Sequence, residues 1–308
     1  MKLWAHRSTL HLMPAADLPM LLGVRRQQVA GYHSWYAKEG LSREQVDILV
    51  GAVVEQLVQG PHSRMDLSRR LVPRLGEWAR PMLEHSWGGI IKLACALGHV
   101  CHGPAEKEQG DGAREALFVG LDHWLGQPLP PVDGRQAMAD LLRRYLAVFG
   151  PATRADFRKF AGGYAEPVHN AFADLAGEMA VIDLDGKPAH ILSRDLDALA
   201  GAAPAPGQIN VLGLFDPYLL AHNDTRQYLD DRFRPAVYRT AGWISPVILR
   251  QGRVVATWTH RRVAGPKGCG AWEVTVSPLE RVYRKELPAI TRGLRRLSGG
   301  LPVTVTGV

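Results

Sequence analysis

A cluster of cysteine and histidine residues is the part of this sequence that most resembles a metal-binding site. Cys95 is followed by His99, Cys101 and His102. Thiolates and imidazoles are preferred zinc ligands, but Cys-x5-Cys-His is not a standard zinc spacing and no second ligand pair follows nearby. If the segment is a strand, Cys101 and His102 also point to opposite faces. We therefore predict no metal site.

Other catalytic patterns are weak. No Gly-x-Ser-x-Gly, phosphate loop or dinucleotide fingerprint occurs, so we expect no small-molecule cofactor. Gln27 and Gln28 are adjacent and on a helix would point about 100° apart, so they could not position one water together. Gln56 and Gln59 share a helix face just before a Gly-Pro turn, where a solvated surface is the simpler interpretation.

A short pattern of turn, cap and arginine occurs twice. GPHSRMDLSRRL begins at Gly60, and GPATRADFRKFAG begins at Gly150. In each copy Ser or Thr stands three residues before Asp, which is an acidic form of the capping box that begins a helix. A helix, a Gly-Pro turn and a second capped helix form a helix-turn-helix, although a paired structural repeat without a ligand has the same pattern. Ser63 and Thr153 should both begin helices.

Strand-like segments follow each repeat. GHVCHGP and ALFVGLDHWL, separated by a polar loop, follow the first copy, and MAVIDLDGKPAHIL with the hairpin turn Asp185-Gly186 follows the second. A helix-turn-helix with a hairpin is a winged helix. We therefore expect winged helices at 41–130 and 131–200, and the linker GAAPAPGQ predicts a boundary near residue 205.

The two ends of the chain complete the expected α+β fold. RSTLHLM and the helix after it look like the last part of a further winged helix, so residues 1–40 are predicted to be a remnant whose strand at Arg7–Leu12 has no preceding partner. After residue 208, GWISPVILRQGRVVATWTHRR predicts a hairpin around Gln251-Gly252. A strand, a basic helix and a terminal strand follow. The prediction is tandem winged helices with a C-terminal α+β region at 208–308.

Composition favours a folded protein with a polyanionic partner. The 308 residues suit two or three modules, and 46% hydrophobic with 22% charged residues can bury cores. No apolar run is long enough to cross a bilayer, MKLWAHRSTLHLM has no secretory h-region, and three cysteines make no disulfide framework, so we expect a cytoplasmic protein. The net charge of +7 favours a polyanion, without choosing DNA over RNA or membrane.

Four segments together resemble the tandem winged-helix DNA glycosylases of the AlkZ/YcaQ type. They are W-A-H-R-S-T-L-H-L, the repeated G-P-x-[ST]-R-x-D, F-D-P-Y-L-L, and G-W-I-S-P-V-I-L…G-R-V-V-A-T-W. The match covers essentially the whole chain. The resemblance implies three winged helices around a basic concave surface, closed by a C-terminal region. It also implies hydrolysis of the N-glycosidic bond of alkylated bases, including bases cross-linked between strands.

One departure from the family bears on catalysis. The resemblance implies a Gln-x-Gln or Gln-x-Asp pair in the first winged helix, ahead of the wing. The wing stands at Arg7–Leu12 here and no Gln-x-Gln occurs, so we expect the motif to be absent and assign no catalytic residue. Cleavage passes through an oxocarbenium-like transition state, so loss of the pair that positions water should lower the rate by orders of magnitude while phosphate contacts still hold DNA. Whether the chain is an enzyme stays open.

The expected partner is double-stranded DNA, bound by a monomer. The candidate contacts, on the wing, the two capped helices and the C-terminal hairpin, are Arg7, Thr9, His11, Arg64, Arg69, Arg154, Arg158, Lys159, Arg250, Arg253, His260, Arg261 and Arg262. For His11 the alternative is a buried, hydrogen-bonded histidine, and for the cations it is an ordinary surface charge. Besides a repair glycosylase, two hypotheses remain. They are a non-enzymatic DNA-binding module and a transcriptional regulator, which would prefer its site by about 10³ or more.

Overall fold

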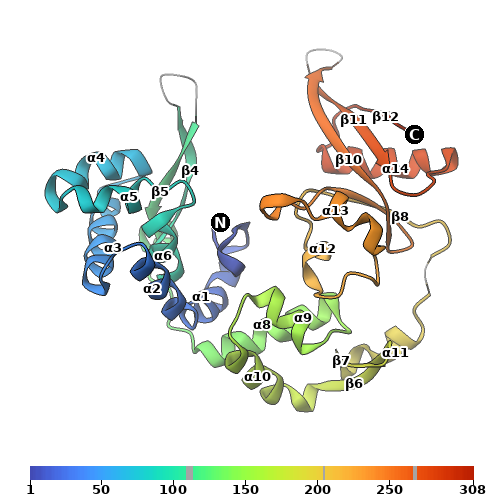
Figure 1. Ribbon diagram of the computed structural model, residues 1–308, viewed down its shortest axis with the longest axis horizontal. Helices are drawn as coiled ribbons and strands as arrows, with labels where there is room; N and C mark the ends of the chain where they lie inside the picture. The colour runs from blue at the N-terminus through green and yellow to red at the C-terminus, as the bar shows by residue number, and fades with distance from the viewer. Residues whose placement is uncertain (109–113, 204, 266–268) are drawn as a thin grey trace. The chain divides into compact units, whose positions relative to one another are not determined.

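The computed structural model describes residues 1–108, 114–203, 205–265 and 269–308. Its contacts divide the chain into two compact units, Met1–Leu192 and Ser193–Val308 (Figure 1). Helices and strands occur in both units, which confirms the α+β class. The finer division of the chain into four parts stays a prediction.

The first unit begins with a small antiparallel sheet. β1 (Lys2–Trp4) pairs with β2 (Leu10–Leu12), with the 3-10 turn η1 (His6–Ser8) between them. The expectation of a strand over Arg7–Leu12 without a preceding partner was therefore wrong. Arg7 and Ser8 take positive φ angles of 53° and 57°, which reverses the chain tightly enough for the first residues to supply the partner strand.

Six helices follow in residues 18–97, the last four of them in the first copy. They are α1 (Leu18–Arg26), α2 (Val29–Lys38), α3 (Arg43–Val58), α4 (Arg64–Leu75), α5 (Arg80–Leu83) and α6 (Gly89–Leu97). Ser63 caps α4: its hydroxyl accepts from the Asp66 amide at 3.1 Å while the Asp66 carboxylate accepts from the Ser63 amide. The predicted start of this helix is confirmed. Apolar faces of α3, α4 and α6, including Leu49, Leu67 and Ile90, form one core.

The wing of the first copy is a three-stranded sheet. β3 (His62–Ser63), β4 (Val100–Glu108) and β5 (Arg114–Gly120) lie in the order β3-β5-β4. The two long strands extend into the segment that was expected to be a loop. The strand expected over LDHWL is instead the helix α7 (Leu121–Leu125), because the ladder ends at Gly120 and Leu121 turns into an apolar cluster with its amide bonded to the His99 carbonyl at 2.8 Å.

The second copy repeats the order of elements. It contains α8 (Gly134–Phe149), α9 (Arg154–Ala161), α10 (Ala165–Asp174), and the hairpin of β6 (Met179–Leu184) and β7 (Lys187–Leu192). Thr153 caps α9 through Asp156, as predicted. Asp185 and Gly186 take φ angles of 52° and 79°, which is the left-handed pair that a tight hairpin requires. Both copies therefore have the predicted sequence of helix, turn, helix and hairpin.

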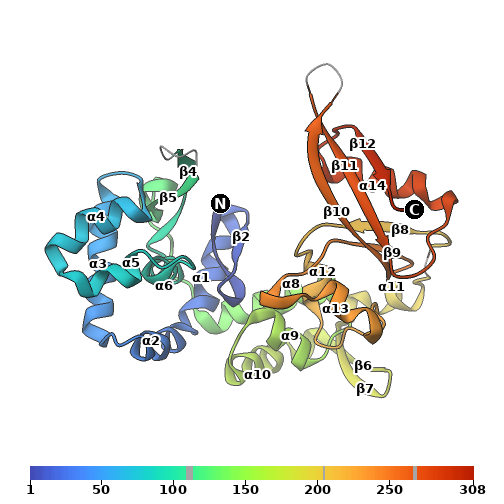
Figure 2. The same ribbon diagram turned by 45° about the horizontal axis from the view of Figure 1, so that its top comes forward.

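The second unit is built on a five-stranded sheet in the order β12-β11-β10-β9-β8 (Figure 2). Its elements are α11 (Leu196–Ala200), β8 (Ile209–Leu212), α12 (Pro217–Ala221), α13 (Arg234–Val237), β9 (Val247–Arg250), β10 (Arg253–Ala264), β11 (Gly270–Pro278), α14 (Leu287–Leu297) and β12 (Val303–Thr306). The predicted turn at Gln251-Gly252 joins β9 to β10. α14 buries Ile290 and Leu294 against the sheet. Within the described residues, no helix has the length and apolarity that crossing a membrane would need.

Candidate nucleic-acid-binding site

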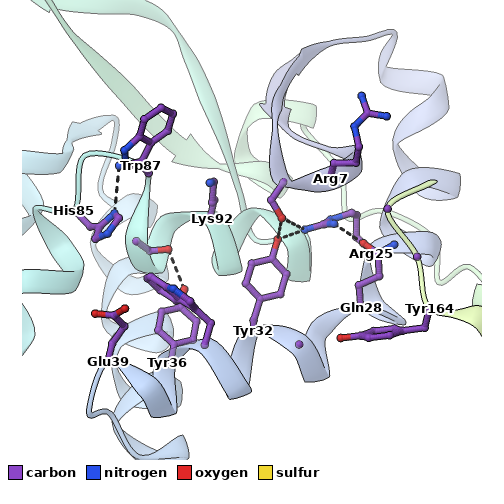
Figure 3. Close-up of a pocket in the computed structure, with 16 residues that line it drawn as sticks. Arg7, Arg25, Gln28, Tyr32, Tyr36, Glu39, His85, Trp87, Lys92 and Tyr164 are labelled. Carbon is purple, nitrogen blue, oxygen red and sulfur yellow. Dashed lines mark hydrogen bonds between the residues drawn. The ribbon is translucent and has the colours of Figure 1, made fainter. Parts of the chain in front are cut away.

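A cavity of about 800 Å³ lies within the first unit. Its walls come from segments far apart in the sequence: the turn η1, the helices α1 and α2, residues 85–92 and residues 162–164. Figure 3 shows His85, Trp87 and Glu39 at one end of the cavity, and Arg25, Gln28 and Tyr164 at the other. The two ends differ in charge.

Arg25 is the most deeply buried cation of this cavity, with 2% of its surface exposed. Its guanidinium donates to the Ser8 hydroxyl at 3.0 Å, to the hydroxyl of Tyr32 and to the side-chain oxygen of Gln28. The guanidinium carbon also lies 5.3 Å from the centre of the Tyr32 ring. Burial lowers the pKa of Arg25 to about 10, so the side chain is still charged at neutral pH. All three side-chain partners are neutral.

Arg7 and Lys92 bring two more cations to the cavity. Arg7 donates to the Phe160 carbonyl at 2.9 Å, and its guanidinium carbon lies 5.8 Å from the centre of that ring. The Lys92 ammonium lies 6.0 Å from the centre of the Trp4 ring. Burial lowers the pKa of both side chains, and the charge of Arg25 lowers that of Lys92 further. Among the residues that the structure describes, no carboxylate lies within 4.0 Å of Arg7, Arg25 or Lys92.

The opposite end of the cavity is aromatic. Trp35, on α2, packs edge-on against His85 with ring centres 5.6 Å apart. Trp87 is 72% exposed, which leaves its ring open for stacking. Glu39, also exposed, is the only carboxylate among the described lining residues. This end can therefore attract a flat ring, and a positively charged ring in particular.

Two glycines allow the walls to approach each other. A Cβ on Gly31 would lie 2.3 Å from the hydroxyl of Tyr164, which precedes α10, so any larger residue would force the Tyr164 side chain to move. Gly89 has a φ of 41°, and a Cβ there would lie 2.1 Å from the Met82 carbonyl oxygen. The buried Tyr36 hydroxyl donates to the Gly89 carbonyl at 2.9 Å and fixes this turn above α2.

The predicted wing contacts are separated by the fold. Arg7 lines the cavity, whereas Thr9 and His11 do not. Thr9 is exposed, and its carbonyl lies 2.9 Å from His11 Nδ1. Burial lowers the pKa of His11, and the charges of Arg7 and Arg25 lower it further against the opposing effect of the backbone bond. His11 is hydrogen-bonded but only partly buried, and its contact with DNA stays a prediction.

The candidate cations on the repeated helices differ in their contacts. Arg64 donates to the His85 carbonyl at 2.7 Å, so it braces the segment that carries one end of the cavity. Arg69 is paired with Asp66, and the Arg154 guanidinium carbon lies 5.2 Å from the centre of the Phe172 ring. Arg158 is exposed, and Lys159 is partly buried. A phosphate contact of Arg158 stays a prediction.

The candidates of the C-terminal hairpin also divide into bound and open side chains. Arg250 donates to both Glu286 carboxylate oxygens at 2.7 and 2.9 Å, and Arg261 donates to Glu273 at 2.7 Å. Arg262 is exposed, with no carboxylate within 4.0 Å among the described residues. The two remaining candidates have other contacts: Arg253 donates to the Gln227 carbonyl at 3.1 Å, and His260 stacks on Trp272 with ring centres 3.9 Å apart.

The cysteine and histidine segment belongs to the core. Cys95 and Cys101 are buried, and the His102 ring centre lies 4.9 Å from that of Trp4 and 4.7 Å from that of Phe118. Burial raises the pKa of Cys101 to about 11, so its thiol stays protonated at neutral pH. Within the described residues, no three His, Cys, Asp or Glu side chains are grouped to hold a metal ion.

The expected absence of a Gln-x-Asp pair was wrong at the level of the sequence. Gln45-Val46-Asp47 and Gln109-Gly110-Asp111 both have this spacing. The first opens α3, where the Gln45 side chain accepts from the Ser42 amide at 2.9 Å and completes the helix cap, away from the cavity lining. The second lies outside the described residues.

The adjacent glutamines diverge, as predicted from helix geometry. Gln27 donates to the Gly134 carbonyl at 2.6 Å, whereas Gln28 faces the cavity and donates to the Ala161 carbonyl at 3.2 Å. The side-chain oxygen of Gln28 is also held by Arg25. Both ends of the Gln28 amide are therefore engaged within the protein.

Sequence reasoning found Arg7 but missed the other charged residues of the cavity, Arg25, Glu39 and Lys92. The available signal was GYHSWYAKEG, a short segment with three aromatic residues and a carboxylate, which forms α2. Aromatic residues at helical spacing usually indicate core packing, so the segment by itself does not reveal a cavity.

Two helix-turn-helix and hairpin repeats beside a cationic and aromatic cavity define a winged-helix protein suited to nucleic acid. The model of the family described as DNA glycosylase AlkZ-like matches residues 1–299. The chain is 32% identical over 264 residues to the interstrand DNA cross-link repair glycosylase of Streptomyces sahachiroi, covering 84% of this chain and 70% of that protein. The chain therefore belongs to the AlkZ-like DNA glycosylase family, as its motifs indicated.

A solved structure agrees with this assignment. The Streptomyces sahachiroi DNA glycosylase AlkZ matches with a TM-score of 0.79 and 28% identity, over 99% of this chain and 81% of that one. The similarity in structure thus extends over essentially the whole chain, including both winged-helix-type repeats and the C-terminal sheet.

Proposed function

We propose that this protein recognises alkylated or cross-linked bases in double-stranded DNA as part of their repair. The observation that carries the proposal is the charge separation of the cavity, with Arg25 at one end, Trp87 and Glu39 at the other, and Lys92 between them (Figure 3). A nucleotide alkylated at a purine N7 has a cationic ring and an anionic phosphate. Aromatic faces and a carboxylate attract the ring, and the cations attract the phosphate.

The size of the cavity supports the same ligand. Small-molecule sites typically enclose about 300–1,000 Å³, and this cavity measures about 800 Å³. Stacking of one base on an aromatic side chain contributes about 1–3 kcal/mol. Exposed arginines such as Arg158 and Arg262 are proposed to add phosphate contacts outside the cavity. We also propose that the protein acts as a monomer, in the cytoplasm.

Excision is proposed to be no faster than spontaneous depurination. Hydrolysis needs a water held in line with the glycosidic bond, and Gln28 is held at both ends of its amide. In the described part of the chain, neither member of Gln45-Val46-Asp47 lines the cavity. Incubating the protein with duplexes that contain 7-methylguanine and counting abasic sites tests this directly, and turnover above the spontaneous rate would contradict it.

Recognition is tested by binding to matched duplexes. One carries 7-methylguanine on a 2′-fluorinated sugar, which resists depurination, and the other carries guanine on the same sugar. The wild type should bind the methylated duplex more tightly. Glu39→Gln should lower the preference for the methylated duplex about 2- to 5-fold, which corresponds to the contribution of one exposed charge pair. Glu44→Gln on α3, outside the cavity lining, is the matched control and should keep the preference. Equal binding of both duplexes by the wild type would overturn the proposal.

A further inference from the structure

Arg25 is a buried cation whose described environment contains no counter-anion. Only 2% of its surface is exposed, yet its side chain is held by the Ser8 and Tyr32 hydroxyls and the Gln28 amide. Its Nε atom is buried without a hydrogen-bond partner. Fully buried arginines are normally paired with a carboxylate, because neutral partners do not offset the loss of hydration of a full charge.

The surrounding charges make this arrangement more costly. Lys92 and Arg7 line the same cavity, and none of the three cations has a carboxylate within 4.0 Å in the described part of the chain. Their lowered pKa values have the same physical origin, which is desolvation without a compensating negative charge. A site of this kind is stabilised when an anion enters.

We propose that Arg25, together with Lys92, is the receptor for a backbone phosphate of the DNA strand whose damaged nucleotide enters the cavity. This rests on the proposed function and adds to it the position of the strand. The Nε–H of Arg25 is left to donate to a phosphate oxygen, and the Lys92 ammonium adds a second positive charge. The hydroxyls of Ser8 and Tyr32 lie beside Arg25 and are hydrogen-bonded to each other at 2.9 Å, so the one that accepts keeps its own proton to donate to the same group.

The orientation of the nucleotide follows from the two ends of the cavity. With a phosphate at Arg25, the base lies toward Trp87 and Glu39 (Figure 3). An entering strand then places its negative charge on the cations and its alkylated, positively charged ring on the aromatic side. The reverse orientation would place the cationic ring against Arg25 and the phosphate against Glu39, so like charges would meet at both ends.

The alternative role for Arg25 is purely structural, as a link between η1 and α2. The two roles predict opposite changes in stability. A buried charge that has no ion-pair partner carries a large desolvation cost, and an apolar side chain of similar size removes that cost without breaking an ion pair. Arg25→Met should therefore leave the thermal unfolding midpoint of the free protein unchanged or raise it. A midpoint several degrees lower would indicate a structural link and would overturn the proposal.

Binding to modified DNA locates the contact. Each phosphate next to the methylated nucleotide is replaced in turn by an uncharged methylphosphonate. A hydrogen bond to a charged group contributes enough for Arg25→Met to weaken binding of the native duplex roughly 10-fold or more. At the linkage that Arg25 contacts, the methylphosphonate should weaken wild-type binding to the same extent. Combining Arg25→Met with that methylphosphonate should then cause no further loss of affinity. Arg26→Met, which changes an exposed neighbour outside the cavity lining, is the control. Its effect on affinity should be the same whichever linkage carries the methylphosphonate.

The outcomes separate this inference from the proposed function. If the wild type does not prefer methylated DNA, the proposed function fails. If the preference is present but Arg25→Met and the methylphosphonate act additively at every linkage, only the phosphate receptor fails. Should Arg25→Met not fold, the same cycle with Lys92→Met decides by the same criterion. A 7-methylguanosine monophosphate that binds as tightly as the methylated duplex would assign the cavity to a free nucleotide and overturn the assignment to a strand.

Discussion

Salt dependence of DNA binding should separate the free arginines of the C-terminal hairpin from those already bound to carboxylates. Arg262 is exposed and has no carboxylate within 4.0 Å among the described residues. Arg250 instead gives two bonds to Glu286 and one of 2.6 Å to the Arg281 carbonyl, with 22% of its side chain exposed. Arg262 can move to a phosphate without breaking an ion pair, whereas Arg250 cannot.

The magnitudes follow from counterion release. Each phosphate contact contributes about 0.9 to the slope of log affinity against log salt, so one contact changes affinity by about 3.5-fold between 50 and 200 mM salt. Arg262→Met should flatten the slope by this amount, and Arg250→Met should leave it unchanged. Arg250→Met should instead lower the free energy of unfolding by about 3 kcal/mol, because Glu286, 8% exposed, is left without its partner.

The measurement is fluorescence anisotropy with one duplex at four salt concentrations, combined with urea unfolding of each variant. The two variants remove the same charge from the same strand pair, so each is the control for the other. Both variants could instead flatten the slope of log affinity against log salt equally, with the free energy of unfolding of Arg250→Met unchanged. That result would show that the ion pair with Glu286 does not hold Arg250 in solution.

Three further outcomes are expected from particular residues. His102 is buried and its pKa is lowered to about 4, so its neutral form is favoured in the folded state. Below the ordinary pKa of about 6.5 the unfolded chain takes up the proton first, so stability should fall by about 2.5 kcal/mol between pH 7 and pH 4.5. Urea unfolding should show that His102→Phe removes this part of the fall, and an unchanged pH dependence would contradict the burial effect. Ser63→Ala and Thr153→Ala should each lower the free energy of unfolding by about 1 kcal/mol through loss of a helix cap, and a change within error would show that the caps are dispensable. Gly31→Ala should weaken binding of methylated DNA with little change in circular dichroism, since the added Cβ meets the Tyr164 hydroxyl, and undiminished binding would place Tyr164 outside the site.

The features that sequence predicted are those that neighbouring residues determine. Ser63 and Thr153 begin helices because each finds its partner, Asp66 or Asp156, three residues later. The turn at Asp185-Gly186 likewise depends on two residues that accept positive φ angles. Such signals depend on residues close together in the chain, which is why both repeats could be recognised from the sequence.

The features that sequence missed depend on distant contacts. Lys2–Trp4 is too short to give a pattern of its own, and it becomes a strand only because η1 reverses the chain against β2. The cavity is harder still to predict, since Arg25, Trp87 and Tyr164 come from segments separated by more than sixty residues. The Tyr164 hydroxyl lies against position 31 of α2, where glycine leaves room for it, and no spacing rule connects these two positions.

The charge of the cavity supports the proposal that recognition and cleavage separate in this protein. Loss of an alkylated base leaves positive charge on the sugar, which Arg25 and Lys92 would oppose rather than stabilise. The same cations favour a bound phosphate, so they strengthen binding without lowering the barrier. Rate enhancement has to come from negative charge or an aligned water at the sugar. Glu39, the carboxylate among the described lining residues, lies at the end of the cavity proposed to hold the base (Figure 3). Its place suits selection of a cationic ring more than stabilisation of a cationic sugar.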